Sequence, residues 1–217
     1  MPSSWIDFLP SLLEGAKVTV QVAVAASVLA IIASFTAGLC KLSRLWAVRA
    51  ATAGYVEIFR GTSLLIQLFW LYFALPFLGI ELPKMWAAIL AVGLNFGAYG
   101  SEIVRSSILA VPKGQWEAAL ALNMKPWQRL VHIVIPQAFV RMLPPFGNLL
   151  IELVKSTSLV YFITMADLTY QAMVLRNNYI SFTTEILALL LLIYFVISAV
   201  VAFGIRMLER KMAAGRM

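Results

Sequence analysis

The sequence predicts an all-α integral membrane protein with about five transmembrane helices, and three observations support this class. First, 62% of the 217 residues are hydrophobic and the mean hydropathy is +0.89, whereas a soluble domain is about 45–50% apolar. Second, charged residues make up only 12% of the chain. Third, the apolar residues gather in stretches long enough to cross a bilayer, which takes about 20 residues. A soluble core could not bury this excess, so the remaining apolar surface needs lipid.

Five stretches of the chain are apolar and long enough to form spanning helices. They cover residues 18–39, 52–75, 85–109, 139–161 and 186–208. We interpret them as helices because barrel strands are short segments of alternating hydrophobicity. No signal-peptide pattern precedes the first stretch, which we expect to stay in the mature protein. No linker or repeat divides the chain, so we predict a single domain over residues 1–217, with room for a short surface helix within 162–185.

Basic residues are distributed unevenly between the connections, and this predicts the orientation. With five spans and the N-terminus outside, most of them fall on the cytoplasmic side, as the positive-inside rule requires. These inner residues are Lys41, Arg44, Arg49, Arg105, Lys113, Lys125, Arg129, Arg141, Arg206, Arg210, Lys211 and Arg216. Only Lys17, Lys84 and Arg176 remain outside, and Arg60 and Lys155 lie within spans. We therefore predict a cytoplasmic C-terminus, and we attribute the net charge of +7 to membrane topology and not to nucleic-acid binding.

The cytoplasmic connection over residues 110–138 predicts a short helix, a sharp turn and a second helix on the inner membrane face. Residues 115–122 are strong helix formers. Asn123 follows them and tolerates the left-handed conformation at a helix end. Pro126 suits the first turn of the next helix, and we expect Pro136 to end that helix.

The first helix of this connection exposes small side chains, at Ala118, Ala119 and Ala121. Small residues let the backbone of another protein approach closely, and Glu117 lies near the helix start, where the helix dipole favours a negative charge. These features suit a docking helix for a cytoplasmic partner. An amphipathic helix that lies passively on lipid headgroups is the alternative.

A family resemblance adds to this interpretation. The run Glu117-Ala118-Ala119, the turn residue Asn123 and the run Ile133-Val134-Ile135-Pro136 resemble the EAA loop of ABC importer permeases. The family pattern is Glu-Ala-Ala, three residues, Gly, nine residues and Ile-x-Leu-Pro. Asn123 stands in place of the Gly and Ile135 in place of the Leu. Both changes are mild because Asn tolerates positive φ and Ile keeps the apolar bulk.

Other segments are similar to the polar amino-acid subfamily, which contains histidine, glutamate, glutamine, arginine and opine permeases. They lie within residues 56–65, 101–105, 111–117, 143–148 and 155–159, so the resemblance covers nearly the whole chain. Ser63 replaces the usual Pro of the first segment. Ser156 replaces the usual Asp of the last segment, a position on the fourth span where a change can bear on substrate preference.

The resemblance implies the type I ABC importer permease architecture and the function of a permease subunit that carries a polar amino acid across the bacterial cytoplasmic membrane. It implies three partners: a cytoplasmic ABC ATPase dimer, a second permease subunit, identical or a sister, and a periplasmic or lipid-anchored solute-binding protein. The implied ATPase-coupling residues are Glu117, Ala118, Ala119, Leu120, Ala121, Asn123 and Pro136. ATP and Mg would bind to the ATPase, so we expect no cofactor, catalytic residue or metal site in this chain.

Three pairs of charged residues recur inside the spans at a spacing of three: Glu57 with Arg60, Glu102 with Arg105, and Glu152 with Lys155. Residues three apart share one helix face, so each pair can neutralise itself. Either the pairs line a polar route for a zwitterion, or they are structural ion pairs near the membrane interface. The candidate route consists of Glu152, Lys155, Ser156, Thr157, Asn148, Gln67 and Asn95, although polar residues also hold spanning helices together.

Several alternatives remain at this stage. An intramembrane enzyme would need a nucleophile with a base or a metal motif, and the chain has one histidine, His132, and one cysteine, Cys40. A channel would need a selectivity filter. A membrane scaffold would bind the ATPase without solute-dependent turnover. Within importers, the solute could instead be an opine or an amino-acid-like compatible solute, such as ectoine or hydroxyectoine.

Overall fold

The computed structural model describes residues 5–214, with side chains from residue 7 to residue 212, and its regular structure in this range is helical. The α-helices are α1 Leu9–Cys40, α2 Trp46–Gly61, α3 Leu64–Phe69, α4 Lys84–Leu109, α5 Lys113–Ala121, α6 Pro126–Gln128, α7 Ile135–Ser156, α8 Leu168–Asn178 and α9 Thr183–Ala214. Short 3-10 or π-helical segments are η1 Trp5–Phe8, η2 Trp70–Ala74, η3 Leu75–Leu78, η4 Arg129–Val134, η5 Thr157–Ile163 and η6 Ile180–Phe182.

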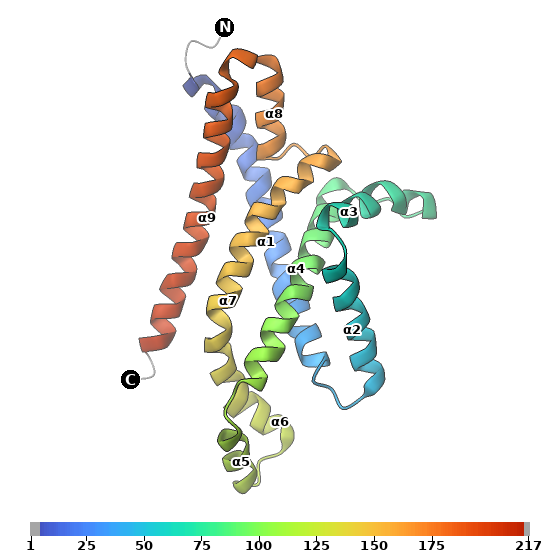
Figure 1. The fold of residues 1–217 in the computed structure, drawn as a ribbon, viewed down its shortest axis with the longest axis vertical. Coiled ribbons are helices and arrows are strands. Elements are labelled where there is room, and N and C mark those ends of the chain that lie inside the picture. Colours follow the sequence, from blue (N-terminus) through green and yellow to red (C-terminus); the bar gives the residue numbers. More distant parts are fainter. Residues whose placement is uncertain (1–4, 215–217) are drawn as a thin grey trace.

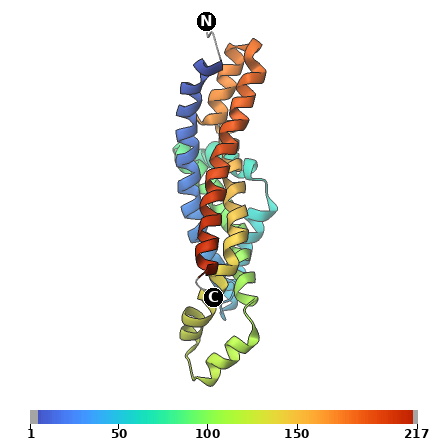
Figure 2. The ribbon, with the colours of Figure 1, turned by 90° about the vertical axis from the view of Figure 1, so that its left-hand side faces the viewer.

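The long helices run side by side along one axis and form the spanning part of the molecule (Figure 1). Four helical stretches, which contain α1, α4, α7 and α9, are long and apolar enough to cross a membrane, and α2 with α3 makes a fifth, bent span. The segment with α5 and α6 protrudes beyond the spans at one end, where α9 also ends, and α8 lies at the opposite end (Figures 1 and 2). The predicted all-α membrane protein with about five spans is confirmed.

The interface between α1 and α4 is the most extensive contact between helices, and glycines make it close. A Cβ atom added at Gly97 would lie 2.6 Å from Cβ of Ala33, and one added at Gly93 would lie 2.7 Å from Cδ2 of Leu29. Glycines four residues apart on one helix allow the backbones of two spanning helices to approach. Gly38 has the same function on α1, where an added Cβ would lie 2.7 Å from Cβ of Val104.

We expect Gly97→Val to push α1 away from α4 and to lower the free energy of unfolding by about 1–3 kcal/mol, the usual cost of overpacking. The measurement is the apparent melting temperature of the detergent-solubilised protein. Gly54→Val is the matched control, since nothing lies within 4 Å of an added Cβ at Gly54. Equal melting temperatures for the two variants would contradict a close α1–α4 contact at Gly97.

The second span is bent, and the prediction of one continuous helix over residues 52–75 is wrong. Helix α2 ends at Gly61, the next helical segment starts at Leu64, and the two segments are bent by 104°. Thr62 and Ser63 have extended dihedral angles, with ψ of 153° and 136°. The bend therefore leaves backbone carbonyl groups at the end of α2 without partners within the helix.

The fourth span is longer than predicted, because Pro136 does not end the preceding helix. A continuous helical stretch runs from Pro126 to Ile163, over 38 residues. Arg129–Val134 is a π-helical segment that ends two residues before Pro136. A widened turn gives the proline ring room that a regular helix would deny it. The predicted second loop helix and the predicted span 139–161 are thus one element.

Helix α8 lies in the connection where a short surface helix was expected, but one of its faces is buried. Leu168 and Ala172 are fully buried in a cluster that contains residues of α1 and α9. The backbone N–H of Leu168 donates to Oγ1 of Thr19 at 3.1 Å. Gly15 permits this approach, because a Cβ there would lie 2.7 Å from the carbonyl oxygen of Asp167.

Asp167 is the N-cap of α8 and is fully buried. Its carboxylate accepts hydrogen bonds from the backbone N–H groups of Tyr170 at 2.9 Å and Thr169 at 3.2 Å. The hydroxyl of Tyr194 lies 3.4 Å from the same carboxylate. Burial raises the pKa of Asp167 from its ordinary 3.8 to about 6, although these hydrogen bonds oppose the change.

The raised pKa of Asp167 predicts a loss of stability with rising pH. The folded protein holds the proton of Asp167 more tightly than the unfolded chain does, so its contribution to stability is full below pH 3.8 and declines until about pH 6. Asp167→Asn should flatten this dependence, since it cannot ionise and keeps one capping oxygen. Melting temperatures between pH 4 and pH 7 test this, with Glu185→Gln, an exposed acid on α9, as the control. A wild-type slope in Asp167→Asn would refute the assignment.

Candidate coupling loop and polar residues of the spans

The predicted turn after the first loop helix is present and is held by backbone hydrogen bonds. Asn123 has a φ of 57°, in the left-handed region. Its N–H donates to the carbonyl of Leu120 at 2.9 Å, and the N–H of Met124 donates to the carbonyl of Ala119 at 3.1 Å. These two bonds form a Schellman motif, which satisfies the last carbonyl groups of α5. The predicted left-handed residue at position 123 is therefore confirmed.

The exposed residues of α5 agree with the predicted docking surface except at one position. Glu117, Ala118 and Ala121 are exposed, as predicted, and Leu120 is 59% exposed. Ala119 is only 2% exposed, so the prediction that it is presented to a partner is wrong. The reason is that α5 packs back on the segment η4, which covers Ala119.

Two hydrophobic residues beyond the turn extend the outward surface of the loop. Leu122 is 75% exposed and Trp127 is 70% exposed. Sequence reasoning included neither residue among the coupling residues, although a leucine and a tryptophan in a polar loop are a visible signal. An exposed hydrophobic patch of this kind is typical of a protein interaction site.

The loop is fixed to the spanning helices by packing and hydrogen bonds. Trp116 and Leu130 pack on a buried cluster that includes Ile108 of α4 and Met142 of α7. Arg141 donates a hydrogen bond to the carbonyl of Ala110. The loop is therefore in direct contact with both α4 and α7. His132 is exposed on this loop, with Nδ1 3.1 Å from the carbonyl oxygen of Gln128.

We expect Asn123→Val to open the turn, because a β-branched residue in the left-handed region costs about 1–2 kcal/mol. That cost raises the population of the open loop about 5–30-fold. Limited trypsin cleavage after the partly exposed Arg129, followed by mass spectrometry, measures this population. Asn123→Gly is the matched control and should cleave as slowly as the wild type, because glycine adopts positive φ freely. Fast cleavage of both variants would show that the asparagine side chain, and not its conformation, stabilises the turn.

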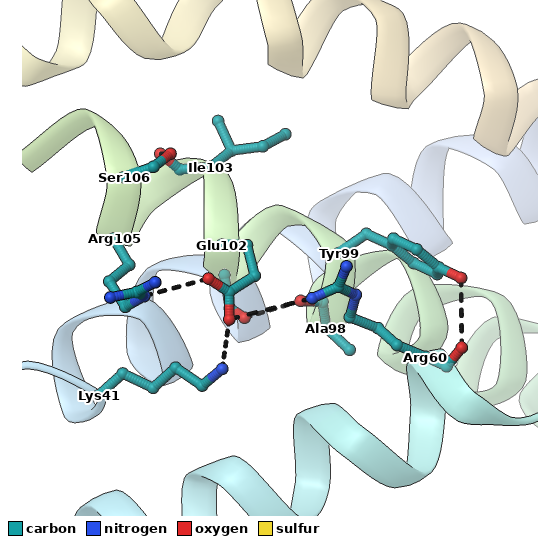
Figure 3. A network of polar contacts seen from close by, with 9 residues as sticks. Lys41, Arg60, Ala98, Tyr99, Glu102, Ile103, Arg105 and Ser106 are labelled. Carbon is teal, nitrogen blue, oxygen red and sulfur yellow. Dashed lines mark hydrogen bonds and ion pairs between the residues drawn. The ribbon is translucent and has the colours of Figure 1, made fainter. Parts of the chain in front are cut away.

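Glu102 of α4 is the centre of an ion-pair network that joins three helices (Figure 3). Its carboxylate accepts hydrogen bonds from Lys41, at the end of α1, and from Nε of Arg105 at 3.0 Å. Arg60 of α2 lies 4.0 Å from the same carboxylate, and its guanidinium lies 5.2 Å from the centre of the Tyr99 ring. The network therefore holds α2 against the α1–α4 pair.

The sequence left open whether the charged pairs line a polar route or are structural ion pairs. For Arg60 and for the pair of Glu102 with Arg105, this network favours structural ion pairs. The predicted pair of Glu102 with Arg105 is confirmed as a structural ion pair. The predicted pairing of Glu57 with Arg60 is wrong, because Arg60 turns to Glu102 instead. The predicted pairing of Glu152 with Lys155 is also wrong: both are exposed on α7, and neither has an ion pair with a described residue.

Gln67 and Asn95 lie together at the bend of the second span. Nδ2 of Asn95 donates to the carbonyl of Phe59 at 2.9 Å and to Oε1 of Gln67 at 3.1 Å. Nε2 of Gln67 donates to the carbonyl of Phe59 at 3.0 Å and to Oγ1 of Thr62 at 2.7 Å. Thr62 in turn donates to the carbonyl of Ile58 at 2.7 Å. These side chains satisfy the carbonyl groups that the bend exposes, which favours a structural function for both amides.

The other predicted route residues lie on α7 and η5 and divide into two groups. Asn148, Glu152 and Lys155 are exposed at a spacing of four and three residues, so they share one open face of α7. Thr157 is fully buried and donates to the carbonyl of Val154 at 2.7 Å. Ser156 is partly exposed beside Lys155. The structure therefore supports an open polar face for the first three residues and not for Thr157.

Apolar spanning helices with a loop packed against one end of them define a multi-pass membrane protein. The chain belongs to the family of binding-protein-dependent transport system inner membrane components, which matches residues 23–214. The predicted family, the inner-membrane location and the function as a transport component instead of an enzyme are thereby confirmed. A member of such a system works with an ATPase and with a solute-binding protein.

Individual relatives agree over nearly their full length. The chain is 45% identical to the probable amino-acid ABC transporter permease protein y4tF of Sinorhizobium fredii, over 98% of this chain and 91% of that protein. It is 34% identical to the glutamine transport system permease protein GlnP of Escherichia coli, over 94% of each chain. A crystal structure of an amino acid ABC transporter with histidines matches with a TM-score of 0.88 at 30% identity, over 97% of this chain and 100% of that chain.

Proposed function

We propose that this chain is the permease subunit through which an ABC importer carries a polar amino acid across the inner membrane, and that α5 docks on the ATPase. The observation that carries the coupling proposal is the geometry of α5. A helix closed by a Schellman motif at Asn123 presents Glu117, Ala118, Leu120 and Ala121 outward from a loop that is fixed to two spans. A groove on the ATPase could receive this surface without the loop being distorted.

The orientation proposed for the chain agrees with this docking. The α5–α6 segment and the end of α9 lie at one end of the molecule (Figure 1), together with basic residues such as Lys113, Lys125 and Arg129. The positive-inside rule then favours a cytoplasmic loop and C-terminus and an external N-terminus. Pro136 acts indirectly in this proposal, since it lies inside the helix that connects the loop to the membrane.

The solute and the remaining partners follow from the relatives and from the open face of α7. The relatives described above are named for amino-acid and glutamine transport, which favours a polar amino acid over a compatible solute or an opine. Asn148, Glu152 and Lys155 offer both charges to a zwitterion. A second permease subunit, identical or a sister, would close the route opposite this face. ATP and Mg would bind to the ATPase dimer, and a periplasmic or lipid-anchored binding protein would deliver the solute.

Co-purification tests the coupling proposal. We would tag this chain in its native host, solubilise the membrane gently and quantify the ATPase recovered with the wild type and with Ala118→Asp. A carboxylate and added bulk at the centre of the docking surface should reduce ATPase recovery about tenfold or more, because an unpaired charge buried at an interface is strongly unfavourable.

Ala118→Ser is the matched control, because it keeps a small side chain and should recover the ATPase at the wild-type level. Size-exclusion chromatography shows whether each variant is folded and inserted. Full ATPase recovery with a folded Ala118→Asp would refute docking through α5. No ATPase with a folded wild type would refute the importer proposal itself.

A further inference from the structure

An open cavity with a volume of about 760 Å³ lies between α7 and α9. Its apolar walls are formed by Ile151 on α7 and by Leu191, Phe195, Ala199, Ala202 and Phe203 on α9. Its polar lining includes Lys155 on α7 and both Ser198 and Arg206 on α9. Of these, only Lys155 was among the route residues predicted from the sequence.

The charge in this cavity is positive and uncompensated. Among the described residues that line it there are two cations, Lys155 and Arg206, and no carboxylate. Neither cation has a hydrogen bond or an ion pair with a described residue. Unpaired cations inside a membrane protein are costly and usually face a water-filled path or an ionic partner.

The hydroxyl of Ser198 is an independent observation that favours a bound ligand in this cavity. Its side-chain oxygen is buried and has no hydrogen-bond partner among the described residues, and the residue is only 9% exposed. A buried hydroxyl without a partner is rare and costly. The other hydroxyl of the lining, on Tyr194, already lies 3.0 Å from Oγ1 of Thr169. Ser198 is therefore the hydroxyl that remains available to a bound molecule.

The two cations are at different levels along the helix axis. Ile205 packs directly on Gly147, since a Cβ at Gly147 would lie 2.7 Å from Cγ2 of Ile205. Arg206 is thus near the level of Gly147, which is eight residues, or about 12 Å along the helix, from Lys155. Two long basic side chains can converge from such a separation on one small anionic group.

The anionic group could be a phospholipid phosphate or the carboxylate of a solute, and the depth of Lys155 in the membrane distinguishes the two. Its neighbours Leu153 and Val154 pack in a cluster with Val92 and Phe96, near the middle of α4. A phospholipid phosphate lies at the membrane surface, far from this level. The carboxylate of a transported solute must pass through the middle of the membrane, so the position of Lys155 favours the solute.

We propose that the α7–α9 cavity is a carboxylate site on the solute route, in which Lys155 and Arg206 neutralise the carboxylate and Ser198 donates a hydrogen bond to it. The proposal rests on the proposed function and narrows its substrate class. Glu152, which precedes Lys155 by three residues on the same face of α7, accepts the solute ammonium. Because no acidic side chain lines the cavity itself, it prefers amino acids with acidic or uncharged side chains over basic ones.

Equilibrium binding tests the site directly. The probes are tritiated L-glutamate, L-glutamine and L-arginine, measured by scintillation proximity on the tagged complex purified as above. We expect L-glutamate or L-glutamine to bind at least about tenfold more tightly than L-arginine. Lys155→Met should weaken that binding about 10–100-fold, Lys155→Arg should retain it, and Ser198→Ala should weaken it less than Lys155→Met.

Lys211→Met is the matched control, since Lys211 is also a basic residue of α9 but does not line the cavity, and it should bind as the wild type does. ATPase recovery with each variant shows that the complex is assembled, and it reports on the proposed function separately from the site.

Four results would overturn the proposal. The first is a wild-type complex that binds none of the three amino acids, and the second is unchanged binding in Lys155→Met. The third is a preference for L-arginine. The fourth is amino-acid binding that survives in Lys155→Met while a co-purified anionic phospholipid, detected by mass spectrometry, is lost, since the cavity would then be a lipid site.

Discussion

The close packing of α1 on α4 is the constraint on which the rest of the structure depends. Gly93 and Gly97 bring the two backbones together, and the pair then offers surfaces to the other elements. Helix α2 is attached to it through the Glu102 network, and α7 packs on the opposite side of α4 (Figure 3). Helix α8 contacts the N-terminal half of α1 through a hydrogen bond to Thr19. The hydrophobic effect does not drive helix association within lipid, so close van der Waals contacts of this kind stabilise the packing of the helices.

Composition and periodicity predicted the class of the protein and the number of spans, because the length of an apolar stretch is a property of the sequence alone. The predictions from composition and periodicity were wrong at two places, where contacts with other parts of the fold break a helix or allow it to continue. The bend at Thr62 and Ser63 lies within an apolar run, and the carbonyl of Phe59 that it exposes is satisfied by Gln67 and by Asn95, a residue of another span. The prediction that Pro136 ends a helix was wrong because the helix continues through it. A π-helical segment accommodates this residue, which usually ends helices.

In the candidate sites, too, features that depend on local residue preferences could be predicted, and features that depend on distant contacts could not. The left-handed turn at Asn123 could be predicted because it depends on local residue preferences. The partner of Arg60 could not, because Glu102 lies 42 residues further along the chain and nothing local distinguishes it from Glu57. Ser198 carried no signal in the sequence, since a serine in a spanning helix usually bonds to its own backbone. Only the absence of such a bond in the folded chain draws attention to it.

The uninterrupted helical stretch from Pro126 to Ile163 makes the fourth span a lever. Its 38 residues correspond to a rod of about 57 Å at ~1.5 Å per residue, which runs from the α5–α6 loop toward α8. A tilt of about 5° at the loop moves the far end of such a rod by about 5 Å. Lys155 lies on the distal part of this rod, so mechanical work done on α5 would displace its ammonium group relative to α9 without any change in the local fold.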